Sequence, residues 1–353
     1  MTSNPKISSY FDEVSYQAER KLFTGEEPSY VGHELMVPRV NDYRVIPQTF
    51  DRYALINHQE HNLALISNTC LHRQAKLLEG QGNTKEIVCK LHCWSYSNTG
   101  ELKNTPHFKN PPKSSLDTLK PYSWNGLLFK NRPPVCDLKS VNLENHINFD
   151  NYFYSSTEVE NYDFNWKIFA EIYLENYHVF SMHPGLKRFV TPGDLQWHFG
   201  EDYSIQKVGI GKNLNHSGTP VYKEWQESVL QAHPEAVPRY GAIWMFLYPN
   251  IMLEWYPNVL VVSTILPTGP RSCVNHVEFY YPKEMYEKNS DYFAKEKAAY
   301  METAVEDNAA CTLLAKGRFA LYQNGAEQSG HLESFLESGV AKFYEYLKEK
   351  CIY

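Results

Sequence analysis

The sequence has 353 residues, a length at which a single hydrophobic core stops growing, and its 42% hydrophobic residues supply enough material for two cores. A formal net charge of -7, without long runs of one sign, argues against nucleic acid as a partner. Seven cysteines are an odd number for a disulfide framework, so reduced thiols and metal ligands are the better expectation.

The amino-terminal residues mix aromatic, acidic and basic side chains without the continuous apolar stretch of a secretory signal. The longest apolar run, around Asn258 to Leu266, is too short to cross a bilayer and predicts a buried strand. We therefore expect a cytoplasmic protein without a membrane partner.

In chain order, we first expect a helical segment over residues 1–28 that packs on the carboxy-terminal domain. Residues 29–135 contain short strand-like runs, separated by turn signals at Gly80, Gly82 and Asn98 to Gly100. This alternation predicts a small all-β domain.

Residues 136–353 have longer elements. A helix-like stretch at Trp166 to Ser181 precedes strand-like runs at Ala242–Leu247, Ile251–Tyr256 and Val274–Tyr280. Glu284 to Lys316 predicts one or two long helices, and Leu332 to Lys350 carries an apolar helical stripe. Helices packed on an antiparallel sheet give an α+β domain.

Two short hooks, each pairing a thiolate with an imidazole, are the strongest signal in the sequence. Cys70 and His72 form the first hook, and Cys89 and His92 form the second. Such a set can hold a tetrahedral zinc, or a two-iron cluster with the cysteines on one iron and the histidines on the other. The hooks lie at the ends of predicted strands, where compact zinc fingers usually have a helix.

The segment CLHRQAKLLEGQGNTKEIVCKLHCWSYSNTGEL resembles the Rieske cluster-binding segment of the ring-hydroxylating oxygenases. Residues beyond the four ligands also match: Arg73, Gly80, Gly82, Trp94, Tyr96 and Gly100. The resemblance implies a [2Fe-2S] cluster with Cys70 and Cys89 on the inner iron and His72 and His92 on the outer iron. Cys93 stands where the family commonly has Gly, and we interpret it as a small filler and not a fifth ligand.

A second candidate metal site lies near His178 and His183. These residues are five apart, so an ideal helix would place them roughly 140° apart around its axis, too far for chelation. Pro184 disfavours helical geometry at His183, so we expect the helix to end or distort there and the imidazoles to converge. Two histidines and one carboxylate on one face are the ligand set of non-haem Fe(II) oxygenases.

This segment is similar to the catalytic-iron motif of the Rieske oxygenases. The matching residues are Asn165, Trp166, Lys167, Glu171, Glu175, Tyr177, His178, His183 and Pro184. The expected third ligand is Asp307, which resembles the late helical Glu-Asp segment of the family. Cys311, one helical turn further on, suggests that Asp307 faces inward. Glu306 and Glu302 remain alternatives, because the sequence does not give the phase of the helix.

Glu175 precedes His178 by three residues, so on a helix the two would share a face and Glu175 could hydrogen-bond the imidazole. In the family, the matching acidic residue bridges the Rieske histidine of one subunit to the catalytic site of its neighbour. The resemblance therefore implies a homotrimer in which Glu175 contacts the partner's His92.

The resemblance covers most of the chain from about Tyr30 and implies a catalytic domain of the helix-grip type with a mononuclear Fe(II). The implied reaction uses O2 to hydroxylate a small organic substrate, by mono-oxygenation, oxidative demethylation or aromatic cis-dihydroxylation. No Rossmann or flavin pattern appears, so electrons from NAD(P)H must come through a separate reductase or ferredoxin. The alternatives are a Rieske electron-transfer protein with an inert second site and a zinc-stabilised binding module.

Overall fold

The computed structural model describes residues 4–59, 62–288, 291–327 and 330–350. The chain forms two compact units, one made of Glu26–Pro133 and one that combines Met1–Gly25 with Pro134–Tyr353. Among the described residues, no helix combines the length and the apolar character needed to cross a membrane. The first unit is all-β and the second is α+β, so the expected fold class is confirmed.

Glu26–Pro133 is built from short strands in three small sheets. Their strand orders are β5-β2-β3-β4-β9, β1-β11-β10 and β6-β7-β8. The strands are β1 Tyr30–His33, β2 Asp42–Val45, β3 Tyr53–Gln59, β4 Asn62–Ser67, β5 Gln81–Asn83, β6 Glu86–Val88, β7 Ser95–Ser97, β8 Leu102–Asn104, β9 Thr118–Leu119, β10 Tyr122–Trp124 and β11 Leu127–Phe129. Two short 3-10 helices, Glu34–Met36 and Pro47–Thr49, lie between them. One core cluster contains Trp94, Tyr96 and both hook cysteines, Cys70 and Cys89.

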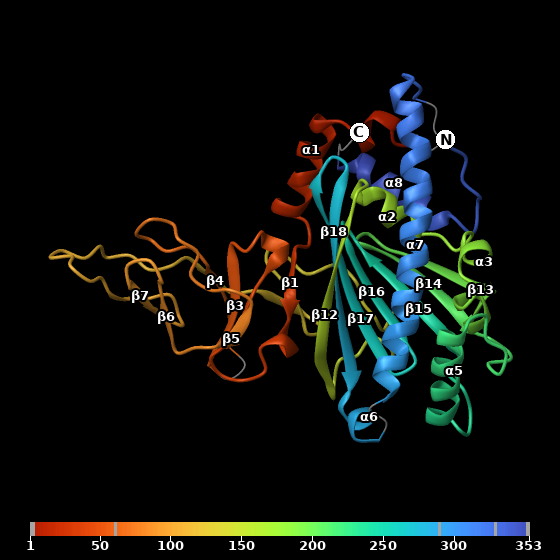
Figure 1. Cartoon of the computed structure of the whole chain (residues 1–353), viewed down its shortest axis with the longest axis horizontal. Coiled ribbons are helices and arrows are strands. Elements are labelled where there is room, and N and C mark those ends of the chain that lie inside the picture. The colour runs from red at the N-terminus through yellow and green to blue at the C-terminus, as the bar shows by residue number, and fades with distance from the viewer. Residues whose placement is uncertain (1–3, 60–61, 289–290, 328–329, 351–353) are drawn as a thin grey trace. The chain divides into compact units, whose positions relative to one another are not determined.

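The second unit is organised around a seven-stranded antiparallel sheet of order β12-β18-β17-β16-β15-β14-β13 (Figure 1). Its strands are β12 Tyr152–Tyr162, β13 Val190–Phe199, β14 Tyr203–Ile210, β15 Tyr240–Leu247, β16 Ile251–Tyr256, β17 Val259–Gly269 and β18 Ser272–Pro282. The expected strands at 242–247, 251–256, 258–266 and 274–280 are all present. Three strands that the sequence did not reveal, β12, β13 and β14, complete the sheet.

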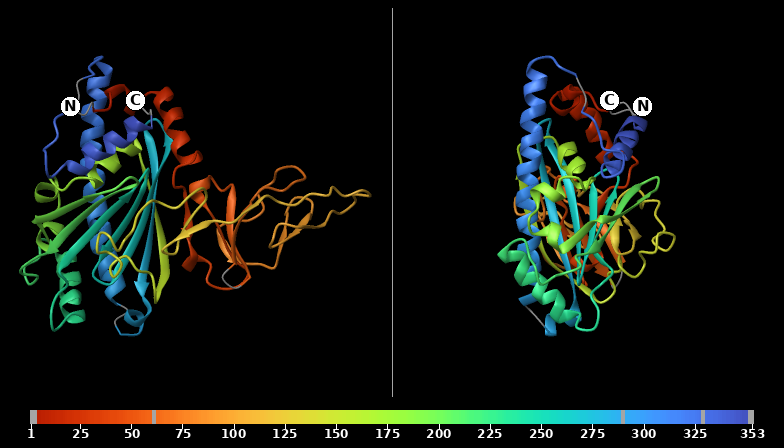
Figure 2. Two further views of the ribbon diagram at one scale, coloured as in Figure 1. Left: turned by 180° about the vertical axis from the view of Figure 1, so that it is seen from behind. Right: turned by 90° about the vertical axis from the view of Figure 1, so that its right-hand side faces the viewer.

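The helices of this unit lie on one face of the sheet and around its ends (Figure 1). They are α1 Glu13–Thr24, α2 Trp166–Tyr173, α3 Val179–Met182, α4 Leu186–Phe189, α5 Pro220–Ala232, α6 Lys283–Lys288, α7 Asp291–Gln323 and α8 Ser338–Glu349, with a 3-10 helix at Ile7–Tyr10. Figures 1 and 2 show the long helix α7 running along the sheet, with α5 at its side. The opposite face of the sheet receives Phe149, which packs against Tyr280 of β18. In this helix-grip arrangement, a binding site can form in the space between α7 and the sheet.

The helix expected from Trp166 to Ser181 is wrong in extent, because the chain breaks into α2 and α3. The carboxylate of Glu175 accepts hydrogen bonds from the backbone N–H groups of Tyr177 and His178. These two N–H groups therefore do not donate to helical carbonyls, and the helix is interrupted between α2 and α3. The broken stretch is the part of the chain that carries His178.

The carboxy-terminal helix also begins later than expected, at Ser338 and not near Leu332. The Glu333 carboxylate accepts the backbone N–H of Phe335 at 2.9 Å and also that of Leu336, which fixes a turn. Phe335, an apolar residue within the stripe expected over Leu332 to Lys350, is exposed.

Candidate functional site

The two Cys-His hooks have the same backbone geometry. The N–H of Gln74 donates to the carbonyl of Cys70 at 3.0 Å, and the N–H of Cys93 donates to that of Cys89 at 2.9 Å. Gln74 and Cys93 both have a positive φ, at 54° and 57°. Glycine adopts this conformation most easily, which is a physical reason why Gly would suit the position of Cys93.

The hook cysteines are buried and the hook histidines lie further out. Cys70 and Cys89 are 1% and 2% exposed and are free thiols, whereas His92 is exposed and His72 is half-buried. The two imidazole rings lie with their centroids 4.7 Å apart, and Tyr96 Oη is 3.2 Å from Cys70 Sγ. Two inner sulfurs and two outer imidazoles are a donor set that fits a Rieske cluster.

His178 and His183 bracket the four-residue helix α3, as its N-cap and C-cap residues. His183 leaves helical geometry, with φ -113° and ψ 82°, directly before Pro184. The distortion brings the two Nε2 atoms to 2.9 Å from each other.

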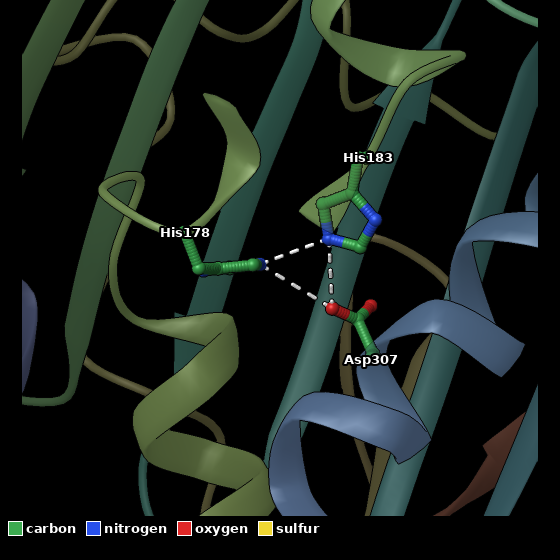
Figure 3. A group of neighbouring side chains, drawn as sticks. All are labelled: His178, His183 and Asp307. Carbon is green, nitrogen blue, oxygen red and sulfur yellow. Dashed lines mark hydrogen bonds and ion pairs between the residues drawn. The ribbon is translucent and has the colours of Figure 1, made fainter. Parts of the chain in front are cut away.

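Asp307 on α7 completes a triad with these histidines, as Figure 3 shows. Its Oδ1 lies 3.0 Å from Nε2 of His183 and 3.4 Å from Nε2 of His178. Three donors about 2.1 Å from one ion and at right angles around it would be about 3.0 Å apart. The three atoms therefore have the separations of the facial triad of a non-haem iron site.

The outer nitrogens of both histidines face carboxylates. Nδ1 of His178 is 2.5 Å from Glu175 Oε1, and Nδ1 of His183 is 2.7 Å from Glu306 Oε2. A carboxylate accepts a proton donor, so each Nδ1 carries the hydrogen and each Nε2 presents a lone pair. Two imidazole lone pairs and the Asp307 oxygen then point at one spot, an arrangement that a metal cation stabilises.

The electrostatics of the triad favour positive charge at the same spot, carried either by a proton or by a metal cation. Burial would lower the pKa of His178, but Asp307 and Glu175 raise it to about 10. Burial would raise the pKa of Asp307, yet the two imidazoles hold it well below its ordinary value. The triad consequently has a strong preference for added positive charge.

The alternatives to Asp307 have other positions in the structure. Glu306 contacts the outer nitrogen of His183, and Glu302 accepts the hydroxyl of Thr219 at 2.7 Å. Glu175 contacts His178 as expected, but from the turn before α3 and not from a shared helical face.

A cavity adjoins the triad between α7 and the sheet. Its lining includes aromatic residues and carboxylates of the described chain: Tyr162, Tyr173, Trp225, Trp244, Tyr256, Tyr300, Glu160, Glu254 and Glu296. Sequence reasoning missed Glu254 and Glu296. Glu254 did leave a signal, since it is the acidic residue inside the apolar strand Ile251–Tyr256.

Both units match known families. Residues 29–123 match the Rieske [2Fe-2S] domain, and residues 149–351 match the catalytic domain of the ring-hydroxylating alpha subunit. The chain is 44% identical over 343 residues to putrescine 2-hydroxylase of Ralstonia nicotianae, covering 97% of this chain and 94% of the relative. It is 38% identical to putrescine 2-hydroxylase of Bordetella bronchiseptica, covering 97% and 83%.

The fold also resembles solved structures. The quaternary ammonium Rieske monooxygenase CntA with L-carnitine superposes with a TM-score of 0.74 at 18% identity, over 98% of this chain and 95% of that one. Naphthalene 1,2-dioxygenase superposes with a TM-score of 0.74 at 16% identity, over 99% and 92%. These likenesses support the same two-unit architecture.

The family assignment favours an oxygenase over an electron-transfer protein or a zinc-stabilised binding module. The cofactors of such a chain are a [2Fe-2S] Rieske cluster and a mononuclear Fe(II), supplied with electrons from NAD(P)H by a separate reductase. The chain therefore belongs to the Rieske non-haem iron oxygenases, and it is the terminal component that hydroxylates a small organic substrate with O2.

Proposed function

We propose that the substrate of this oxygenase is a short aliphatic diamine, hydroxylated at a carbon atom. The observation that carries this proposal is the charge of the cavity next to the triad. It is lined by carboxylates and aromatic rings, and among the described residues no Lys or Arg lines it. Such a lining suits a cation, and two relatives that match nearly the whole chain are putrescine 2-hydroxylases.

The proposed reaction converts a C–H bond of the diamine into C–OH. One oxygen atom of O2 enters the product and the other leaves as water, with two electrons from the reductase and two protons. The bound iron supplies the O2 chemistry. The chain's own contribution is to hold and orient the diamine in a cavity lined by aromatic rings and carboxylates.

Product analysis tests this function. The holoenzyme, a reductase and NADH are incubated under 18O2 with putrescine, and in separate reactions with choline, L-carnitine or naphthalene. We expect one labelled oxygen in a hydroxylated diamine, with NADH and O2 consumption matched to product. Hydroxylation or demethylation of another substrate, with none of putrescine, would contradict the proposal.

For the metals, we propose Cys70, His72, Cys89 and His92 as cluster ligands, and His178, His183 and Asp307 as ligands of the mononuclear iron. The first assignment is supported by the buried thiols and outer imidazoles of the paired hooks. The second is supported by the donor separations within the triad.

We also propose a homotrimer in which Glu175 lies against the partner's His92. Exposure of His92 and the contact from Glu175 to His178 support this arrangement, since one carboxylate would then reach both metal sites. The structure of a quaternary ammonium Rieske monooxygenase has given insights into inter-subunit electron transfer in that protein. Native mass spectrometry should give three chains, and Glu175→Gln should slow cluster reoxidation by O2 and substrate without changing cluster content. A monomer with full activity would contradict this proposal.

We propose functional domains at residues 29–135 and 136–353, with residues 1–28 packed on the domain at 136–353. Trp166 Nε1 donates to Glu19 at 2.7 Å and Lys167 pairs with the same buried carboxylate, which supports that packing. We propose a cytoplasmic location because Cys70, Cys89, Cys93, Cys273 and Cys311 are free thiols.

A further inference from the structure

The cavity extends from the triad along the inward face of α7. The lining residues Glu296, Tyr300, Thr303 and Asp307 follow one another at spacings of four, three and four residues, so they form one helical stripe. Glu254 of strand β16 faces this stripe and contacts it through Tyr300. The cavity therefore has the metal triad toward one end and buried carboxylates away from it.

The Glu254 carboxylate is held in a fixed position inside the cavity wall. It is 3% exposed, and it accepts the hydroxyls of Tyr256 at 2.7 Å and Tyr300 at 2.8 Å, one on each oxygen. Trp244 Nε1 in turn donates to the Tyr256 hydroxyl at 2.8 Å. A carboxylate offers about four acceptor sites, so these two hydrogen bonds leave it capacity for another donor.

No cation of the described chain neutralises Glu254. Neither Lys nor Arg lines the cavity, and none of the ion pairs between described residues includes this carboxylate. Burial raises the pKa of Glu254 to about 7, against the hydrogen bonds from the two tyrosines and with the charge of Asp307. A buried carboxylate without a neighbouring cation is stabilised most by a ligand that carries positive charge and N–H donors.

We propose that Glu254 binds one ammonium group of the substrate and thereby selects a cationic amine over a neutral compound of the same length. This inference rests on the proposed function, which it deepens by assigning the end of the substrate away from the iron. The rings of Tyr256 and Tyr300, with centroids 6.2 Å apart, add aromatic surface beside the cation.

The length of the stripe suits a short diamine. Tyr300 and Asp307 are seven residues apart, about 10 Å along the helix at roughly 1.5 Å per residue. An extended four-carbon diamine measures about 6 Å between its nitrogens, from ordinary bond lengths. With one ammonium at Glu254, its carbon chain extends toward the triad.

The test compares putrescine with 1,4-butanediol, which has the same carbon chain and a neutral hydroxyl in place of each ammonium. Hydroxylated product is measured with holoenzyme, reductase and NADH for wild type and Glu254→Gln. We expect KM for putrescine to rise about 10- to 150-fold, the range for losing a hydrogen bond to a charged group. KM for 1,4-butanediol and kcat should change little, so the preference for putrescine collapses. Glu254→Asp should restore part of the preference, and Tyr300→Phe should weaken it less.

Glu278 offers a matched control. Glu278 is also buried, at 2% exposure. Its carboxylate accepts a hydrogen bond from the hydroxyl of Tyr280, two residues later in the sequence, at 2.9 Å. Glu254 accepts from the hydroxyl of Tyr256 with the same sequence spacing. Glu278 is absent from the cavity lining. Glu278→Gln should therefore leave the ratio of kcat/KM for putrescine and 1,4-butanediol at the wild-type value.

The outcomes separate this inference from the proposed function. If wild type hydroxylates putrescine and Glu254→Gln keeps the preference for putrescine over 1,4-butanediol, the role of Glu254 is overturned and the function stands. The same holds if Glu278→Gln loses the preference equally. If wild type does not hydroxylate putrescine, the proposed function fails, and the role of Glu254 fails with it.

Discussion

Glu306 and its neighbour Asp307 hold the two nitrogens of one imidazole. Glu306 Oε2 lies 2.7 Å from Nδ1 of His183, and Asp307 Oδ1 lies 3.0 Å from Nε2 of the same ring. Successive helical residues point about 100° apart, so α7 can place its two carboxylates on different sides of the ring. The helix thus fixes both the orientation and the tautomer of His183.

Glu306→Gln should weaken iron binding at the triad. Glutamine keeps one oxygen that can accept from Nδ1, but it lacks the negative charge that holds the hydrogen there and strengthens Nε2 as a ligand, and such partners typically contribute 10- to 100-fold in metal affinity. Iron release to a chelator, followed by its absorbance, should be faster by about that factor. Glu302→Gln is the control, because Glu302 contacts Thr219 and not a histidine. Equal release from wild type and Glu306→Gln would contradict this role.

Asp307→Ala should abolish the mononuclear iron site and leave the cluster site intact. The triad loses its only charged donor, so the mononuclear iron and hydroxylation should be lost, while the cluster iron, acid-labile sulfide and visible spectrum remain. Asp291→Ala, at an exposed position on the same helix, should keep all of these properties. Full hydroxylation by Asp307→Ala would show that another residue is the third ligand.

The local geometry of the two proposed metal sites was largely predictable because it depends on residues close in sequence. Each hook is a turn whose proposed ligands lie two or three residues apart, and the departure of His183 from the helix follows from Pro184. Local spacing, however, does not fix the phase of a 33-residue helix. Packing of α7 on the sheet decides that Asp307 faces the histidines while Glu306 supports one of them.

The cavity could not be predicted for a related reason. Glu254 and Tyr300 lie 46 residues apart and meet only when β16 and α7 pack together. The break between α2 and α3 also depended on a side chain, because Glu175 replaces helical carbonyls as the acceptor for two backbone N–H groups. The cavity thus depends on contacts between residues far apart in the sequence, and the helix break depends on side-chain capping. Hydrophobic periodicity predicts neither.

Cys93→Gly should stabilise the hook that contains Cys89. Cys93 has a φ of 57°, which costs a residue with a Cβ about 1–2 kcal/mol, while added chain entropy with Gly offsets roughly 0.5–1 kcal/mol. A net gain of up to about 1.5 kcal/mol should raise the unfolding midpoint of the holoprotein with an unchanged cluster spectrum. Leu91→Gly, exposed in the same hook and without a positive φ, should lower the midpoint instead. Loss of the cluster from Cys93→Gly would indicate that this thiol takes part in binding it.

Glu296 should make the stability of the catalytic unit fall as pH rises. Burial raises its pKa to about 8, against the hydrogen bond from Tyr281 and with the charge of Glu254, while Lys297 lowers it. Between about pH 5 and 8 the unfolded carboxyl is ionised and the folded one keeps its proton, so the folded state binds more protons. The contribution of Glu296 to the free energy of unfolding is therefore fully present below about pH 4.5. It is lost as the pH rises through about 8.

The measurement is the urea unfolding midpoint of wild type and Glu296→Gln across pH 5.5 to 9. The variant cannot ionise, so its stability relative to wild type should increase with pH by an amount on the order of a few kcal/mol and level off above pH 8. Comparing the two proteins at each pH cancels the titration of groups they share. Glu224→Gln, on the exposed side of α5, should parallel wild type at every pH. A constant difference between wild type and Glu296→Gln would mean that Glu296 is ionised in the folded protein throughout this range.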